Sequence, residues 1–269
     1  MRNSALITKI KGKLYAALSL LQFARYFTNW REVWTSYRSG AAIPPLEFRD
    51  GLKVHHGEGD DAIMLFREMF VDRPYTRQHF YVPKPGDTIV DLGANIGGFT
   101  LYLLSLTRRI NVHCFEPSRA TLGMLRRNVE VNHVEDLVSI YPIAVCDRSG
   151  TTHMSMRGPS VQRALVDGSR TDKADVEEVR TMSLDDAIAL CTAGEIDLLK
   201  MDIEGAELEA VTSASPALWS RIKRVAMEYH ECFRPGCLAQ LCRALRDNGF
   251  VNIDVEPANV GQGILRAGK

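Results

Sequence analysis

Apolar residues follow two different spacings along this chain. From residue 86 onward, short runs of β-prone residues alternate with segments in which apolar residues recur every three or four positions. This alternation of strands and helices predicts an α/β fold, with a parallel sheet and helices on both of its faces. We expect strands at Ile89–Val90, Val112–Phe115 and Val138–Asp147, in the runs IDLLKMD and RVAMEYHE, and as a closing pair at Phe250–Val255 and Gly263–Arg266.

The pattern before residue 86 predicts a separate N-terminal part. Residues 1 to about 40 have helical periodicity. Asp50-Gly51 between alternating residues indicates a hairpin, and residues 60–71 again have helical spacing. We therefore expect a helical N-terminal extension over residues 1–45 and one α/β domain over residues 46–269.

The run IVDLGANIGGFTLYLL, residues 89–104, predicts a buried strand, a glycine turn and the start of a helix. Glycines at such a junction let the backbone approach a ligand, because no Cβ intervenes. The order Asp91-x-Gly93-x-x-x-Gly97 differs from the G-x-G-x-x-G of dinucleotide sites, since Asn95 occupies the third place. An acid at the strand end would repel a pyrophosphate but could accept hydrogen bonds from the ammonium of S-adenosylmethionine (SAM). The motif resembles the SAM-binding loop of Rossmann-like methyltransferases, and a glycine-rich turn in another α/β protein is the alternative.

A second strand and helix are expected in the run NVHCFEPSRATLGMLRRNVEVN. Glu116 is predicted at the strand end, and Pro117 in the first turn of the helix. An acid about 20 residues after a glycine loop can bind both hydroxyls of a ribose. The alternative is a carboxylate that only stabilises the helix dipole, and the two roles are compatible.

Ligands of open α/β sheets bind beyond the carboxyl ends of the strands. In this chain the expected strand ends supply acids or a histidine toward one rim of the sheet. These residues are Asp91, Glu116, Asp147, Asp202 with Glu204, and Glu228 with His230. A structural role is the strongest alternative for Asp147, because it precedes the turn residues Ser149-Gly150.

Several motifs resemble those of FkbM-type SAM-dependent methyltransferases: VDLGANIGGFTL, HCFEPS, IYPIAVCD, TMSLDD, LLKMDIEGAE and VAMEYHE. The resemblance covers residues 86–231. It implies a Rossmann-like SAM-methyltransferase sheet in the domain 46–269, SAM as methyl donor, and O-methylation of a sugar, glycan or small natural product. One departure is that Val211–Ala214 stand where family members often have a glycine, which concerns the exit of a helix more than the chemistry.

On this interpretation, the glycine loop holds the methionyl part of SAM and Glu116 binds the ribose. Asp147 would accept a hydrogen bond from the adenine amine. The expected cofactor-binding residues are Asp91, Gly93, Ala94, Asn95, Gly97, Glu116 and Asp147. Tyr75 is a further candidate for the methionyl carboxylate, although a packed cap is its more common role.

Methyl transfer from a sulfonium requires the protein to align the acceptor oxygen and to assist the loss of its proton. Asp202 is the expected base, with Glu204 two residues on and His230 as the alternative base. Asp202, Glu228 and His230 could also hold a divalent ion of the magnesium or manganese type, which would lower the pKa of the hydroxyl. The alternative role of Glu204 is compensation of a helix dipole.

The charge and the cysteine content of the chain limit the classes of partner and the compartment that we expect. The 33 basic and 33 acidic residues cancel, so the chain has no overall electrostatic reason to bind nucleic acid or an anionic membrane. The six cysteines include no C-x-x-C pair, and their spacing matches no common zinc site. We therefore expect free thiols in a reducing cytoplasm. No secretory signal is evident.

The N-terminal extension contains a basic amphipathic helix, in which Lys9, Lys11, Lys13 and Arg25 flank apolar residues. Such a helix could contact a membrane surface peripherally. Packing on its own domain or on a partner subunit is the commoner arrangement. Oligomeric state is left open by the sequence.

Two other classes of function are compatible with the same fold. The first is a methyltransferase acting on nucleic acid or protein. Enzymes that modify bases often have an aromatic residue after the fourth strand, where this chain has Asp202-Ile203-Glu204-Gly205. The second is a non-catalytic binding protein, against which the acids at each strand end argue. The acceptor is not identified by the sequence, and the polar segment Gly158–Asp175 is predicted to be a loop that shapes its pocket.

Overall fold

A computed structural model of the chain describes residues 17–57, 62–155, 165–166, 176–191, 194–259 and 261–269. The chain divides into two compact units, Met1–Glu58 and Gly59–Lys269. Among the described residues, every helix is too short or too polar to span a lipid bilayer.

Aromatic packing organises the first unit. Residues 17–26 are helical, α2 spans Trp30–Ser39, and the strands β1 (Leu46–Glu47) and β2 (Lys53–Val54) pair antiparallel. The buried rings of Phe27 and Phe48 lie 5.0 Å apart, edge to face. The hairpin predicted around Asp50-Gly51 is confirmed, and the side chain of Asp50 accepts a hydrogen bond from the backbone of Leu52.

Two expectations for the N-terminal region are not tested. The basic residues Lys9, Lys11 and Lys13 of the expected amphipathic helix lie outside the described residues. The expected domains, residues 1–45 and 46–269, also stay predictions.

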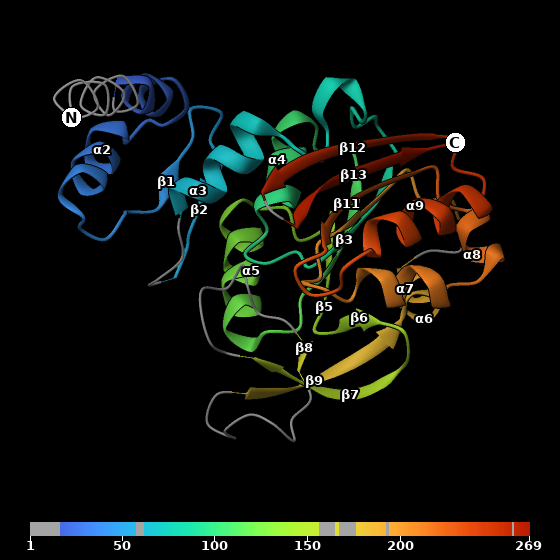
Figure 1. Cartoon of the computed structure of the whole chain (residues 1–269). Helices are drawn as coiled ribbons and strands as arrows, with labels where there is room; N and C mark the ends of the chain where they lie inside the picture. The colour runs from blue at the N-terminus through green and yellow to red at the C-terminus, as the bar shows by residue number, and fades with distance from the viewer. Residues whose placement is uncertain (1–16, 58–61, 156–164, 167–175, 192–193, 260) are drawn as a thin grey trace, which may run out of the picture. The chain divides into compact units, whose positions relative to one another are not determined.

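A seven-stranded sheet forms the centre of the second unit (Figure 1). Its order is β12-β13-β11-β10-β3-β4-β5, and every pair is parallel except those that β13 makes with β11 and β12. The strands are β3 (Thr88–Leu92), β4 (Asn111–Phe115), β5 (Val138–Tyr141), β10 (Leu198–Met201), β11 (Arg224–His230), β12 (Asn252–Asn259) and β13 (Gln262–Gly268). The mostly parallel α/β sheet predicted from the sequence is therefore confirmed.

Helices cover both faces of this sheet. On β3, Val90 and Leu92 pack against apolar side chains of α6 to α9, whereas Asp91 faces Thr100 of α4 on the other side. Leu125 of α5 lies against Gly97, at the start of α4. The helical segments are α3 (Ala62–Phe66), the π-helix η1 (Arg67–Asp72), the 3-10 helix η2 (Arg77–His79), α4 (Gly98–Leu106), α5 (Arg119–Val131), α6 (Leu184–Cys191), α7 (Glu207–Ser213), α8 (Pro216–Ser220) and α9 (Cys237–Asp247).

The single strand predicted at Val138–Asp147 is wrong, because the chain turns between β5 and β6. Pro142 has no N–H to donate to a sheet, and the backbone N–H of Ile143 bonds to the carbonyl of Tyr141 at 2.9 Å, closing a tight turn. β6 (Ala144–Cys146) therefore joins a second sheet of order β6-β9-β7-β8, with β7 (Gly150–Ser155), β8 (Leu165–Val166) and β9 (Val176–Ser183). Most of the loop predicted at Gly158–Asp175 lies outside the described residues.

A buried ion pair links the two central strands. Lys200 on β10 stands directly beside Asp91 on β3, with 3.2 Å between its Nζ and Oδ1 of Asp91. The same ammonium donates to the carbonyls of Gly93 at 2.8 Å and Leu92 at 3.3 Å. Burial alone would lower the pKa of Lys200, but the carboxylates of Asp91 and Asp202 outweigh it and raise the pKa, so the ammonium stays charged.

The turn after β3 touches the end of β10. Gly93 has a φ of +72°, and a Cβ placed on it would lie 1.8 Å from the backbone oxygen of Asp202. Only glycine permits both this backbone conformation and this approach. The two segments that leave the centre of the sheet are therefore in backbone contact.

We expect Gly93→Ala to lower the free energy of unfolding by roughly 2–5 kcal/mol, because about 1–2 kcal/mol of left-handed strain adds to about 1–3 kcal/mol of overpacking. Gly86→Ala is the matched control: its φ is +91°, and nothing lies within 4 Å of the added methyl. Denaturant unfolding of both variants measures the difference. Equal losses for the two variants would contradict the close approach to Asp202.

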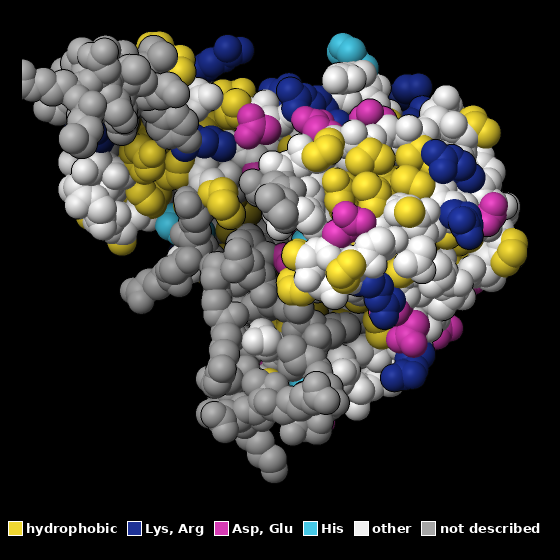
Figure 2. Space-filling view, in the orientation of Figure 1, with side chains coloured by type: hydrophobic (Ala, Val, Ile, Leu, Met, Phe, Trp, Pro, Cys, Tyr) yellow, Lys and Arg dark blue, Asp and Glu magenta, His cyan; other side chains and the backbone are white. Residues whose placement is uncertain are grey.

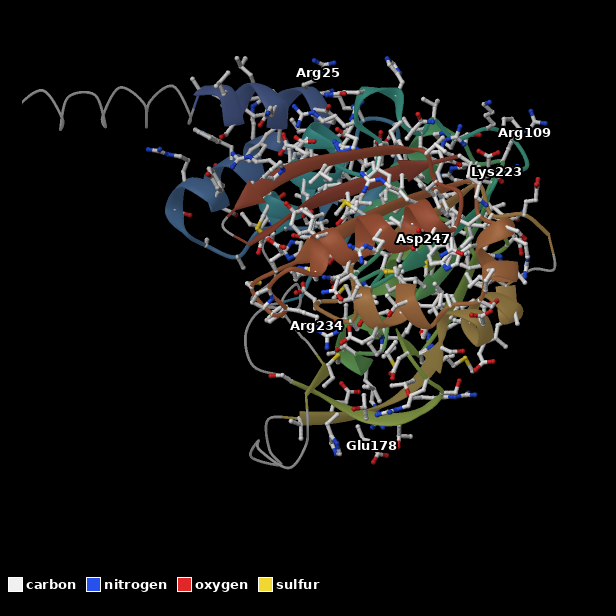
Figure 3. The ribbon with its side chains drawn as sticks, turned by 45° about the vertical axis from the view of Figure 1, so that its right-hand side comes forward. Arg25, Arg109, Glu178, Lys223, Arg234 and Asp247 are labelled. Carbon is white, nitrogen blue, oxygen red and sulfur yellow. The ribbon has the colours of Figure 1, made fainter. Side chains whose placement is uncertain are left out.

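We expect Lys200→Met to destabilise the fold by roughly 3–5 kcal/mol, because it leaves the carboxylate of Asp91 buried without its cation. Adding Asp91→Asn should recover part of this loss, since the buried charge is then removed as well. Lys223→Met is the control, because this lysine is 43% exposed although it pairs with Glu195 and Asp197 (Figure 3). Chemical denaturation of the four proteins would refute the ion pair if the double variant were no more stable than Lys200→Met.

Candidate active site

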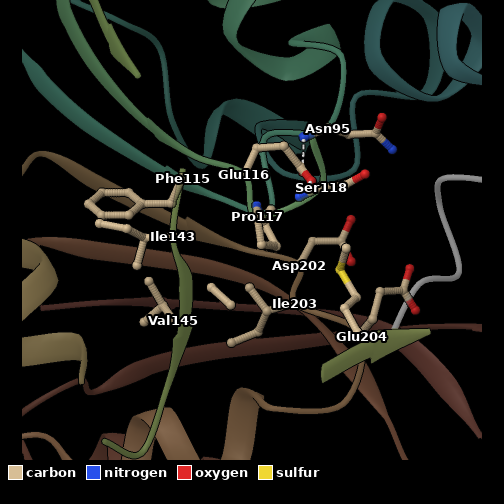
Figure 4. A pocket seen from close by; sticks show the side chains of 13 residues that line it. Asn95, Phe115, Glu116, Pro117, Ser118, Ile143, Val145, Asp202, Ile203 and Glu204 are labelled. Carbon is tan, nitrogen blue, oxygen red and sulfur yellow. Dashed lines mark hydrogen bonds between the residues drawn. The ribbon is translucent and has the colours of Figure 1, made fainter. Parts of the chain in front are cut away.

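A cavity opens at the carboxyl ends of β3, β4 and β10, where the order of the parallel strands reverses around β3 (Figure 4). This is the place where open α/β sheets bind ligands. Figure 4 shows Glu116 and Asn95 on one side of the cavity, and Asp202 and Glu204 on another. The lining residues are Gly93, Asn95, Phe115, Glu116, Pro117, Ser118, Ile143, Ala144, Val145, Met154, Asp202, Ile203 and Glu204.

The glycine loop and Glu116 hold each other in place. Asn95 has a φ of +51°, and its backbone N–H donates to Oε2 of Glu116 at 3.0 Å. Oε1 of Glu116 accepts from the backbone of Ser118 at 2.9 Å, and the side chain is only 7% exposed. The carboxylate thus fixes the loop while it lines the cavity. Ala94 and Gly97 belong to the same loop but do not line this cavity.

The prediction that Pro117 lies in the first turn of the helix is wrong. Ser118 is the N-cap of α5, because its hydroxyl accepts from the backbone of Thr121, and the helix begins at Arg119. Pro117 therefore precedes the cap and lines the cavity instead.

Asp91 and Asp147, also expected to bind the cofactor, do not line this cavity either. Asp91 is fully buried, and its carboxylate binds Lys200 and the hydroxyl of Thr100, which donates at 2.7 Å. Asp91 does not line the cavity, so it supports the loop from beneath. Asp147 lines a second cavity, where its side chain is 42% exposed and 3.8 Å from Arg148. Direct contact of either residue with a cofactor stays a prediction.

The four residues predicted for catalysis come together beside the cavity. Nε2 of His230 lies 3.6 Å from Oε2 of Glu204 and 3.9 Å from Oε1 of Glu228. Single ligand atoms of Asp202, Glu228 and His230 all lie within 4.8 Å of one another. The carboxyl ends of β10 and β11 therefore bring these side chains together, as parallel neighbouring strands should.

Other residues hold this cluster. The buried carboxylate of Glu207 contacts Nδ1 of His230 at 3.1 Å and also accepts from the backbone of Ile203 and Gly205. Tyr75 donates its hydroxyl to Oδ2 of Asp202 at 3.2 Å. Tyr75 is therefore a partner of Asp202, and its predicted contact with a methionyl carboxylate is untested.

Burial among like charges shifts the titration of this cluster. Burial first, and then Asp202, raise the pKa of Glu204 to about 8 and that of Glu68 to about 7. The same two causes raise the pKa of Glu228. Burial disfavours a charged imidazole at His230, but the bond to Glu207 and the nearby carboxylates raise its pKa to about 9. The site thus contains an excess of acidic groups that favours positively charged ligands.

The second cavity, of about 330 Å³, meets the first at Glu204, which lines both. This volume is at the lower end of the roughly 300–1,000 Å³ found for small-molecule pockets. The half-exposed ring of Phe233 packs on Gly205 at its edge. The remaining lining is largely polar: Cys146, Asp147, Arg148, Thr151, Thr152, Thr181, Ala206 and Glu209.

Sequence patterns did not reveal every functional neighbour. Lys200 has a local signal, because it is a charged residue inside the apolar run LLKM and must find a buried partner. Glu207 lies in the first turn of a helix, where an acid is common for local reasons, so the sequence does not indicate its contact with His230. Glu68 gives no local signal, since its proximity to Asp202 arises from the fold alone.

The surface charge on one face of the molecule gives no reason to expect a polyanionic ligand. On the face seen in Figure 2, basic and acidic side chains of the described residues are mixed, in line with the net charge of zero. A broad basic surface for a polyanion is not seen on that face of the described residues.

Comparison with known proteins agrees with this geometry. Residues 91–252 match the family described as Methyltransferase FkbM domain. The chain is 31% identical over 236 residues to 31-O-demethyl-FK506 methyltransferase FkbM of Streptomyces tacrolimicus, which covers 77% of this chain and 89% of the relative. It is 26% identical over 162 residues to 2-O-methyltransferase NoeI of Sinorhizobium fredii (strain NBRC 101917 / NGR234), covering 55% of this chain and 65% of the relative.

A solved structure shares the fold. Methyltransferase FkbM from Methylobacillus flagellatus KT has a TM-score of 0.53 and 15% identity, over 96% of this chain and 60% of that one. At this identity the likeness concerns the fold alone. The match over more than half of the chain, together with the identity to the Streptomyces enzyme, shows that the protein belongs to the FkbM methyltransferase family and is a methyltransferase.

Proposed function

We propose that this chain transfers the methyl group of SAM to a hydroxyl oxygen of a sugar, a glycan or a small natural product. The observation that carries the proposal is the cavity with Glu116 on one wall and Asp202 on another. Glu116 suits the ribose of a nucleoside, and Asp202 suits a hydroxyl that must lose its proton. Two relatives bear names of O-methyltransferases, which favours oxygen as the acceptor atom.

The charge of the site supports SAM rather than a phosphorylated nucleotide. SAM carries a sulfonium and an ammonium, and the cavity is lined by Glu116, Asp202 and Glu204. The same carboxylates would repel a pyrophosphate. The backbone of Gly93 and Asn95 would hold the methionyl part, and Ala144 and Val145 would lie by the adenine.

The reaction would be an in-line displacement. A lone pair of the acceptor oxygen forms a bond to the methyl carbon as the bond from carbon to sulfur breaks, which leaves neutral S-adenosylhomocysteine. Asp202 lines the cavity, and Tyr75 fixes its orientation through Oδ2. Asp202 would therefore take the hydroxyl proton. The second cavity would hold the rest of the acceptor, since it meets the cofactor cavity at Glu204.

Calorimetric titration with SAM tests the cofactor. We expect Glu116→Ala to weaken binding by roughly 1–3 kcal/mol, because the ribose would lose a buried acceptor. Glu130→Ala, at an exposed position of the same helix α5, should bind as the unchanged protein does. Because Glu116 also fixes Asn95 and Ser118, circular dichroism must show that the variant is folded. No heat of binding at high micromolar SAM would refute the proposal.

Transfer of labelled methyl from SAM tests the reaction, with sugars, polyketide alcohols, RNA and protein offered as acceptors. We expect label in hydroxyl-bearing small molecules or glycans. Asp202→Asn should slow transfer roughly 10²–10⁴-fold while SAM affinity changes little, because the base acts mainly in the transition state. Label in RNA or protein alone, or an unchanged rate for Asp202→Asn, would contradict this assignment.

A further inference from the structure

The side chains of Asp202, Glu228 and His230 have the spacing of ligands around one ion. One oxygen of each carboxylate and one ring nitrogen lie within 4.8 Å of one another. Donor atoms on opposite sides of a divalent ion are roughly 4–5 Å apart, given bond lengths of about 2.0–2.6 Å. We propose that these three residues bind a divalent cation of the magnesium or manganese class, His230 through Nε2.

Each of the three side chains is held by an outer partner, which at His230 and Asp202 engages the atom that faces away from the cluster. Nδ1 of His230 is engaged by Glu207, which is only 3% exposed, so Nε2 faces the carboxylates. Tyr75 holds Oδ2 of Asp202, and Gln262 donates at 3.5 Å to Oε1 of Glu228, the oxygen nearest Nε2, whose second lone pair stays available. Histidine ligands of metal ions usually donate their second nitrogen to a carboxylate in this way.

A second observation supports a cation at this position. Oδ1 of Asp202 is buried and has no hydrogen-bond partner among the residues that the structure describes. A buried carboxylate oxygen without a partner is costly, and an ion bound to it would remove that cost. Nε2 of His230, on a side chain only 5% exposed, faces Glu204 and Glu228 at 3.6 and 3.9 Å, beyond hydrogen-bond distance, and would exchange its proton for the cation.

The nearby lysine does not fill this role. Nζ of Lys200 is 3.9 Å from Oδ2 of Asp202, but it already binds Asp91 and the carbonyls of Leu92 and Gly93. Its ammonium therefore belongs to the junction of β3 and β10. The chemistry of two carboxylates and one imidazole suits manganese or magnesium, with water or the acceptor hydroxyl in the remaining positions.

The use of the cation rests on the proposed function, whereas its binding does not. A cation beside Asp202 would hold the acceptor oxygen and lower the pKa of its proton. Loss of the cation would then weaken binding of the acceptor more than binding of SAM.

Titration of Mn²⁺ into chelator-treated full-length protein tests binding directly, with electron paramagnetic resonance reporting free Mn²⁺. We expect one site that Mg²⁺ competes for. Glu228→Gln and His230→Ala should each weaken it at least tenfold, and Glu207→Gln should weaken it roughly 10–100-fold through the orientation of His230. Glu195→Gln removes the same charge at a side chain that is 69% exposed, and should bind as the unchanged protein does.

The results of these titrations distinguish the cation site from the proposed methyl transfer. No Mn²⁺ site at millimolar concentration, or equal binding by Glu228→Gln and the unchanged protein, would overturn the cation site. Release of Mn²⁺ when SAM saturates the protein would overturn it too, because the sulfonium would then take its place. SAM binding without Mn²⁺ binding leaves methyl transfer standing, and the reverse result leaves the cation site standing.

Discussion

The arrangement of the site depends on a single ammonium buried between two parallel strands. Lys200 pairs with Asp91 across β10 and β3, and its remaining donors bind the carbonyls at the start of the glycine loop. The strand interior tolerates this charge because the ammonium contacts the carboxylate of Asp91, which Thr100 holds, and two backbone carbonyls. The same junction brings Gly93 against the backbone of Asp202. One electrostatic contact thus positions the loop that lines one wall and the acid that lines another.

From that junction outward, neighbouring strands concentrate acids. Asp202 follows β10, Glu228 and His230 lie at the end of β11, and Glu116 follows β4. Burial of so many carboxyl groups is unfavourable without compensating positive charge. Positively charged ligands would supply that compensation.

Local patterns were sufficient where both partners of a feature lie close in sequence. The glycine turn, Glu116 at a strand end and the hairpin at Asp50-Gly51 have this character. Contacts that join distant segments could not be predicted. Lys200 meets Asp91 only because of the register of β10 on β3, and Glu68 approaches Asp202 only through the packing of η1. The break at Pro142 has no hydrophobic signal, because apolar residues continue across it. Hydrophobicity alone therefore does not indicate the change of sheet.

That break places a second, small sheet beside both cavities. Ile143 to Val145 and Met154 line the first cavity, while Thr151, Thr152 and Thr181 on the small sheet line the second cavity. The small sheet has its own pairing, so its outer strands can change without altering the register of the parallel strands. Substitutions at Thr151, Thr152 or Thr181 would therefore reshape the second cavity without altering the strand order at the first.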